Sequence, residues 1–149
     1  MRLVLQRVTR ASVTVDGAVT GAVGLGLMVL VGIGHEDTPA IVKAFADKTC
    51  DLRIFRDDAG LTNLSLMDVG GEVLAISQFT LYADTRKGRR PSFLGAAPPA
   101  LGNELYEAYC AALEARGVRV GRGVFGAEMA VELVNDGPMT IWLDSAASA

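Results

Sequence analysis

Hydroxyl and amide side chains gather in one short stretch, Ser77-Gln78-Phe79-Thr80-Leu81-Tyr82-Ala83-Asp84. It lies near the end of a predicted strand, where polar side chains are unusual, and is therefore a candidate for chemistry. An ordinary amphipathic strand explains the same residues and is favoured by the pattern alone. Neither Ser77 nor Thr80 has an evident base that would activate it as a nucleophile. There is no GxSxG motif, and the single His35 is distant in sequence and typical of a turn.

A dense positive segment follows directly, Thr85-Arg86-Lys87-Gly88-Arg89-Arg90-Pro91, with four positive charges in five residues. The whole chain has a net charge of −3 and a pI of about 5.1, which by itself argues against nucleic acid as a partner. Most charge runs of this kind are solvated loops. Because this one adjoins the polar strand end, a polyanion such as RNA is a reasonable ligand.

A third unusual stretch is Asn135-Asp136-Gly137-Pro138, which separates two apolar runs near the end of the sequence. Asn-Gly or Asp-Gly alone would predict a tight hairpin turn. Pro138 has no N–H and a fixed φ, so it disturbs the start of the strand that should follow. The pattern alone favours a trans Gly137–Pro138 bond, since only about 5–6% of X–Pro bonds in folded proteins are cis.

The sequence offers little that could hold a metal or a cofactor. Cys50 and Cys110 fall in helical patterns without a CxxC motif, which predicts buried, reduced thiols. Asp57-Asp58 lacks further ligands and is typical of a solvated turn. The glycine-rich residues 21–26 have the wrong spacing for a dinucleotide loop and precede a strand. We therefore expect neither a metal nor a cofactor.

Hydrophobic periodicity predicts the elements that must position these residues. Thr38-Pro39 and Pro98-Pro99 each start a helix, and Arg116-Gly117 closes the second one. Strands are predicted over residues 3–8, 12–15, 27–31, 52–55, 72–83, 118–120, 129–134 and 139–143. About eight strands and two helices make an α/β or α+β fold with much antiparallel pairing.

Length and composition predict one packed domain over residues 1–149, with a frayed tail at 145–149. Half of the 149 residues are hydrophobic and 21% are charged. No apolar run approaches the ~20 residues of a membrane span. The N-terminal residues 1–7 become polar too soon for a signal peptide. We expect a soluble cytoplasmic protein.

Two of these stretches match signature motifs, and together the chain resembles the D-aminoacyl-tRNA deacylase (D-tyrosyl-tRNA deacylase) family. The motifs are Ser77-Gln78-Phe79-Thr80-Leu81-Tyr82-Ala83 and Asn135-Asp136-Gly137-Pro138-Met139-Thr140. The resemblance extends over nearly the whole chain and includes Gln6-Arg7-Val8, residues 84–93 and residues 123–127. It implies an α/β fold of layered, mixed and largely antiparallel sheets packed with two main helices.

The resemblance also implies an enzyme that hydrolyses the ester between a D-amino acid and tRNA and rejects L-aminoacyl-tRNA. Glycine has no side chain to reject, so glycine mischarged on tRNA(Ala) is a plausible second substrate. The backbone N–H groups of Phe79 and Thr80 are candidates for stabilising the tetrahedral oxyanion, and Ser77 and Gln78 would shape the site. Since no base is evident, assistance by the ribose 2′-OH is favoured over a threonine nucleophile.

The remaining implied roles concern binding. The family's Gly-Pro peptide is cis and reaches into the other subunit of a homodimer, so the carbonyls of Gly137 and Pro138 would exclude L-residues. Phe125 and Met129 match positions that line the pocket near the terminal adenosine, although ordinary core packing explains them equally well. The tRNA-binding residues would be Arg86, Lys87, Arg89 and Arg90.

Two other functions remain open from the residues alone. The positive segment by itself is compatible with a non-catalytic RNA-binding module. The hydroxyl groups are compatible with a Ser/Thr hydrolase of small esters or amides. Turnover of D-aminoacyl-tRNA would distinguish a deacylase from an RNA-binding module. A requirement for tRNA would distinguish it from a hydrolase of small esters or amides.

Overall fold

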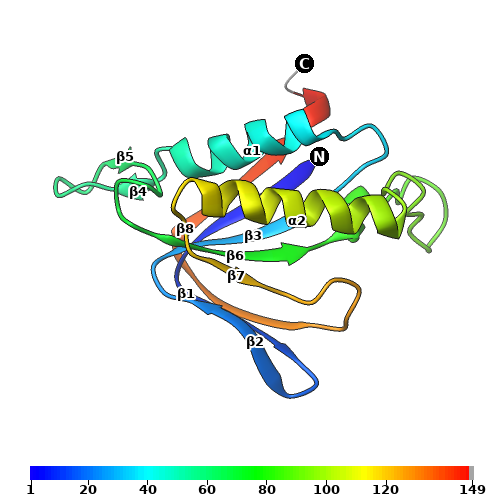
Figure 1. The fold of residues 1–149 in the computed structure, drawn as a ribbon, viewed down its shortest axis with the longest axis horizontal. Helices are drawn as coiled ribbons and strands as arrows, with labels where there is room; N and C mark the ends of the chain where they lie inside the picture. The colour runs from blue at the N-terminus through cyan, green and yellow to red at the C-terminus, as the bar shows by residue number, and fades with distance from the viewer. Residues whose placement is uncertain (148–149) are drawn as a thin grey trace.

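The computed structural model describes residues 1–147 and contains one mixed sheet, a small hairpin and two α-helices (Figure 1). The strands are β1 (Arg2–Val15), β2 (Ala18–Val23), β3 (Gly26–Gly32), β4 (Phe55–Arg56), β5 (Thr62–Leu64), β6 (Glu72–Ser77), β7 (Val120–Arg122) and β8 (Ala130–Asp144). The helices are α1 (Pro39–Asp51) and α2 (Pro99–Ala115), with short 3-10 helices η1 (Phe79–Tyr82) and η2 (Ser145–Ala147).

The main sheet has the order β2-β1-β3-β6-β7, and β8 also pairs with β1. β1 is antiparallel to β2, β3 and β8, whereas β3–β6 and β6–β7 are parallel. Both α-helices lie on the same side of the sheet (Figure 1). The predicted fold class, with mixed and largely antiparallel pairing and two main helices, is confirmed.

The central strands are buried on both faces, which explains their nearly continuous apolar runs. Successive residues of a strand point to opposite faces, so Leu3, Val29 and Ala75 belong to the core under the helices. Met28 and Ile76 belong to a second, smaller core on the other face. This second core is enclosed because the sheet curls. A Cβ built on Gly21 of β2 would lie 2.7 Å from the Arg122 carbonyl oxygen of β7.

The helix boundaries follow from local capping, as the sequence predicts. The Thr38 hydroxyl accepts a hydrogen bond from the Ile41 N–H at 3.3 Å, and Pro39 occupies the first turn of α1. α2 begins at Pro99 and is followed by the C-cap Arg116 and by Gly117 with φ +86. Cys50 and Cys110 are buried and free, as expected. No helix among residues 1–147 is long and apolar enough to cross a membrane.

Strand lengths differ from the prediction where two long strands pair with each other. The predicted strands at 3–8 and 12–15 form one strand, β1, because β8 pairs with it along nearly its whole length. The predicted strands at 129–134 and 139–143 likewise form one strand, β8. Of the tail that we expected to fray, Ser145–Ala147 form η2, and residues 148–149 lie outside the described residues. η2 is held because the Ser145 hydroxyl accepts a hydrogen bond from the Met1 ammonium at 2.5 Å.

Candidate functional site

The first signature motif lies where β6 ends and the chain turns into η1. The last ladder pair joins Ser77 to Val31, and the partner strand β3 ends one residue later. The Gln78 N–H still donates to the Val31 carbonyl at 2.7 Å, after which the Leu81 N–H donates to the Gln78 carbonyl at 3.2 Å. The predicted strand over 72–83 is therefore wrong beyond Ser77, because no partner continues alongside it.

η1 leaves two backbone donors available at its start. The N–H groups of Phe79 and Thr80 have no acceptor among residues 1–147. This is expected for the first residues of a helix, whose N–H groups have no preceding turn to bind. Two adjacent free N–H groups at the end of a rigid strand are the arrangement that an oxyanion hole requires.

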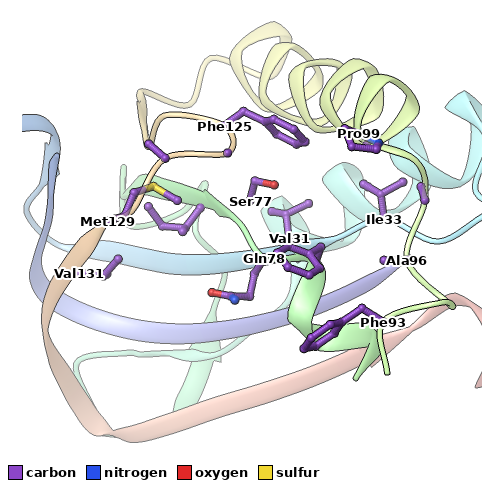
Figure 2. Close-up of a pocket in the computed structure, with 16 residues that line it drawn as sticks. Val31, Ile33, Ser77, Gln78, Phe93, Ala96, Pro99, Phe125, Met129 and Val131 are labelled. Carbon is purple, nitrogen blue, oxygen red and sulfur yellow. The ribbon is translucent and has the colours of Figure 1, made fainter. Parts of the chain in front are cut away.

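A cavity of about 570 Å³ opens beside this turn, between the end of β6, the start of α2 and residues 125–131. Figure 2 shows Ser77 and Gln78 beneath Phe125 and to one side of Met129, with Phe93 near the opposite end. Ser77, Gln78, Phe79, Phe125 and Met129 all line it, so the structure brings together five of the predicted site residues. Its wall is mostly apolar with a few polar groups, which is typical of a ligand pocket.

None of the described residues that line this cavity has an acidic or basic side chain. The Thr80 side chain does not line it, and its hydroxyl accepts a hydrogen bond from the Gln78 amide. His35 lies on the surface in a turn, with Nε2 2.9 Å from the Leu94 carbonyl oxygen. The pocket therefore offers no side chain that could act as a general base on Ser77 or Thr80.

Aromatic rings form one rim of the cavity. The ring centroids of Phe79 and Phe93 are 5.1 Å apart, with planes at 74°, and the Phe79 side chain is largely exposed. Such edge-to-face pairs stabilise each other beyond the area that they bury. The contact fixes the loop after η1 against the turn that carries the two free N–H groups.

The positive segment is a loop next to this rim, and its two ends are joined by a β-bridge between Asp84 and Ser92. Asp84 and Ser92 exchange both backbone hydrogen bonds, at 2.7 and 2.9 Å, and Phe93 follows directly in the cavity wall. The Arg86 guanidinium donates to both oxygens of Asp84, at 2.9 and 2.7 Å. These hydrogen bonds hold the pKa of the Asp84 carboxyl well below its usual range. Arg86 is therefore already paired.

The other three cations of the segment are exposed. Within residues 1–147, no carboxylate pairs with Lys87, Arg89 or Arg90. Three of the four predicted tRNA-binding side chains are thus free to meet phosphate, and the fourth stabilises the loop that carries them.

The second signature motif is not a hairpin turn, which corrects the prediction from the sequence. β8 pairs with β1 on both sides of it, since Asn135 lies opposite Val8 and Thr140 lies opposite Gln6. Residues 136–139 therefore bulge out opposite the single residue Arg7. No cis peptide bond occurs in residues 1–147, so Gly137–Pro138 is trans, and the cis bond implied by the resemblance is not present. Gly137 makes the bend instead, with φ +115.

Arg7, to which the sequence analysis gave no role, supports this bulge from inside. Its side chain is only 2% exposed, donates from Nη1 to the Ile54 carbonyl at 2.5 Å, and places Nε 2.9 Å from Asp136 Oδ2. The Nε–Asp136 contact has the distance of an ion pair but not the direction of a hydrogen bond. An arginine inside an otherwise apolar strand pattern was the signal that could have indicated it.

The bulge and the cavity do not meet within one chain. Neither Gly137 nor Pro138 lines the cavity, and both are exposed. Among the described strands, β8 pairs only with β1, so its other edge is open. No group of three or more potential metal ligands was found among residues 1–147.

Residues 4–144 match the family model described as D-Tyr-tRNA(Tyr) deacylase. The chain belongs to this family. A D-aminoacyl-tRNA deacylase of Roseiflexus castenholzii is 60% identical over 146 residues, which cover 98% of this chain and 93% of the relative. One of Deinococcus radiodurans is 60% identical over 144 residues, covering 97% and 99% of the two chains.

Two solved structures share the fold of this chain. One described as a c-Myc DNA unwinding element binding protein has a TM-score of 0.90 and 42% identity, covering 97% of this chain and 99% of that chain. Another, described as a probable eukaryotic D-amino acid tRNA deacylase, has a TM-score of 0.82 over 95% and 97% of the two chains. At 20% identity the second likeness shows the fold alone.

Proposed function

We propose that this chain hydrolyses the ester bond of D-aminoacyl-tRNA, releasing the free D-amino acid and tRNA, and rejects L-aminoacyl-tRNA. The observation that carries the proposal is the pocket at the end of β6, in a chain 60% identical to named D-aminoacyl-tRNA deacylases. The reaction needs no cofactor, since water attacks the ester carbonyl and the tRNA leaves as its ribose hydroxyl. The chain acts as one domain, in the cytoplasm, where charged tRNA is used.

The chemistry rests on backbone groups and on the substrate itself. The free N–H groups of Phe79 and Thr80 stabilise the negative charge that develops on the carbonyl oxygen. Since none of the described residues that line the pocket is an acid or a base, the ribose 2′-OH of the terminal adenosine assists the attack of water. Ser77 and Gln78 position the ester, and Gln78 holds the Thr80 hydroxyl away from that task.

The terminal adenosine occupies the apolar end of the cavity. Phe125 offers an aromatic face on which a base can stack, and Met129 fills the side of the pocket with a flexible thioether. Lys87, Arg89 and Arg90 bind phosphates of the tRNA beside the mouth, where they add affinity without reading sequence.

The chirality filter is supplied by a second copy of the chain. Gly137 and Pro138 are exposed on a strand with one open edge, and they do not line the cavity of their own chain. Residues that complete the site of a partner subunit are expected to be placed in this way. The carbonyl groups of Gly137 and Pro138 then face the substrate α-carbon, where an L side chain would collide with them. Glycine lacks a side chain, so glycine mischarged on tRNA(Ala) is also hydrolysed.

The test is deacylation of matched D-tyrosyl-tRNA and L-tyrosyl-tRNA by the wild-type protein. We expect release of D-tyrosine only, and no turnover of D-tyrosine methyl ester, which lacks the ribose. Binding of tRNA without turnover would instead identify a non-catalytic RNA-binding protein. Undiminished hydrolysis of a tRNA ending in 2′-deoxyadenosine would exclude assistance by the 2′-OH.

The filter is tested with Pro138→Ala, using Pro39→Ala at the exposed start of α1 as the matched control. We expect Pro138→Ala to lower the ratio of D to L hydrolysis while the circular dichroism spectrum stays unchanged. The control should keep the wild-type ratio. Full D-activity with full L-rejection in Pro138→Ala would contradict the assignment of the filter to this motif.

A further inference from the structure

We infer that Arg2 is a positioning residue for the deacylation reaction, because it fixes the turn η1 that carries the Phe79 and Thr80 N–H groups. The inference rests on the proposed role of these two donors. Arg2 does not line the cavity, so it acts on the reaction only through the backbone that it holds.

Four contacts place Arg2 between the catalytic turn and the end of β8. Its Nη1 donates to the Leu81 carbonyl of η1 at 2.9 Å, and its Nε donates to Asp144 Oδ2 at 3.0 Å. Its guanidinium carbon lies 4.5 Å from the ring centroid of Tyr82 and 5.7 Å from that of Trp142. One side chain therefore binds η1 by a carbonyl and by a ring, and is itself anchored by a carboxylate.

η1 depends on such outside support because it is a four-residue 3-10 helix with few internal bonds. It lies against the end of β3, where a Cβ on Gly32 would be 3.0 Å from Leu81 Cβ. A Cβ on Gly34 would be 2.6 Å from the Tyr82 hydroxyl oxygen. The two glycines provide a flat surface under η1, and Arg2 provides the contact on its carbonyl side.

Arginine suits this position better than lysine. The planar guanidinium can lie over aromatic rings while its edge donates to a carboxylate and to a carbonyl at the same time. A lysine keeps the charge but presents a single ammonium group. Only about one-third of the Arg2 side chain is exposed, so its contacts with Leu81 and Asp144 are partly shielded from water.

The experiment compares Arg2→Met with Arg119→Met. Arg119 is a matched control, since it also pairs with one carboxylate, Glu72 at 2.9 Å, and one carbonyl, Ala22 at 3.2 Å, away from the cavity. A displacement of about 1 Å in a catalytic group can cost roughly 100-fold in rate. We expect Arg2→Met to lower kcat for D-tyrosyl-tRNA by about 10-fold to 100-fold, with KM within about twofold of wild type.

Two further measurements separate positioning from stability. Activity is measured well below the melting temperature of each variant, and the amide chemical shifts of Phe79 and Thr80 are recorded by NMR. We expect these shifts to move in Arg2→Met and not in Arg119→Met. Arg2→Lys should restore part of kcat. If Arg2→Met does not fold, Asp144→Asn replaces it, since it keeps Arg2 but removes the charge that orients its guanidinium.

An unchanged kcat in a folded variant with moved amide shifts would overturn the inference, as would a rise in KM alone. Equal losses in Arg2→Met and Arg119→Met would also overturn it. Inactive wild-type protein would instead refute the proposed function, so the two failures are distinguishable.

Discussion

Replacement of Gly137 by alanine tests whether the bulge in β8 requires a glycine packed against a buried arginine. Gly137 has φ +115, a backbone conformation that L-residues rarely adopt. A Cβ built there would overlap the Arg7 Nη2 atom. Arg7 cannot move aside freely, because its side chain is 2% exposed and donates to the Ile54 carbonyl at 2.5 Å.

The expected loss of stability has two parts. The backbone conformation costs an alanine about 1–3 kcal/mol. Displacement of Arg7 weakens a charged hydrogen bond to the Ile54 carbonyl, a type of bond that contributes about 1.5–3 kcal/mol. We therefore expect Gly137→Ala to lower the free energy of unfolding by about 2.5–6 kcal/mol, and to lower the ratio of D to L hydrolysis because the bulge moves.

Urea unfolding followed by the fluorescence of Trp142, the single tryptophan, measures the loss. The matched control is Gly17→Ala, since Gly17 has φ +79 and nothing within 4 Å of a built Cβ. The control should cost only the backbone part, about 1–3 kcal/mol. All variants are compared at one protein concentration, because dimerisation would stabilise the folded state.

A double-mutant cycle isolates the contact itself. In an Arg7→Met background the clash is absent, so Gly137→Ala should cost only as much as Gly17→Ala. Equal losses for Gly137→Ala and Gly17→Ala in the wild-type background would refute the reasoning.

Three further predictions concern the pocket, the positive loop and the core. Thr80→Val should keep kcat within about tenfold of wild type, whereas a loss near the ~10⁶-fold of a removed nucleophile would show that the hydroxyl reacts. The Lys87→Ala/Arg89→Ala double variant should reduce the slope of log K against log salt concentration for tRNA binding by about two units. Arg86→Ala should change this slope little, because the Arg86 side chain is already paired with the Asp84 carboxylate. Burial raises the pKa of the Cys110 thiol to about 11. Ellman's reagent should therefore label Cys110 at pH 8 only after unfolding. The free energy of unfolding should fall as pH rises above about 8.5, because the thiol then ionises in the unfolded state before it ionises in the folded state. Rapid labelling of the folded protein would contradict this.

The sequence by itself determined the features that depend on near neighbours. Capping by Thr38-Pro39 and Gly117 fixed the helix ends, because the atoms involved lie within four residues of each other. Apolar patterning identified buried central strands, at residues 27–31 and in the first part of 72–83. That these strands are buried on both faces is visible only in the structure. The two signature motifs indicated the family, and five of the predicted residues do meet in one cavity.

Only the tertiary structure decided where strands end and which charges are free. β6 stops at Ser77 because its partner β3 stops, which no residue of β6 reveals. Asn135 to Pro138 contains an ordinary turn signal, yet it bulges within a strand because β1 pairs on both sides of it and Arg7 fills the space beneath. These contacts join residues that are distant in sequence, such as Val31 with Ser77 and Val8 with Asn135, so local pattern carries no information about them.

The difference between the features that the sequence predicts and those that only the tertiary structure sets has one physical cause. A helix cap is stabilised by residues a few positions away, and the periodic pattern of an apolar face is contained in one segment of chain, so both can be recognised locally. Strand ends, bulges and the contacts of Arg2 depend on hydrogen bonds and packing supplied by distant segments. Their energies exist only once the sheet has formed, and the free N–H groups of η1 are among the features set in this way.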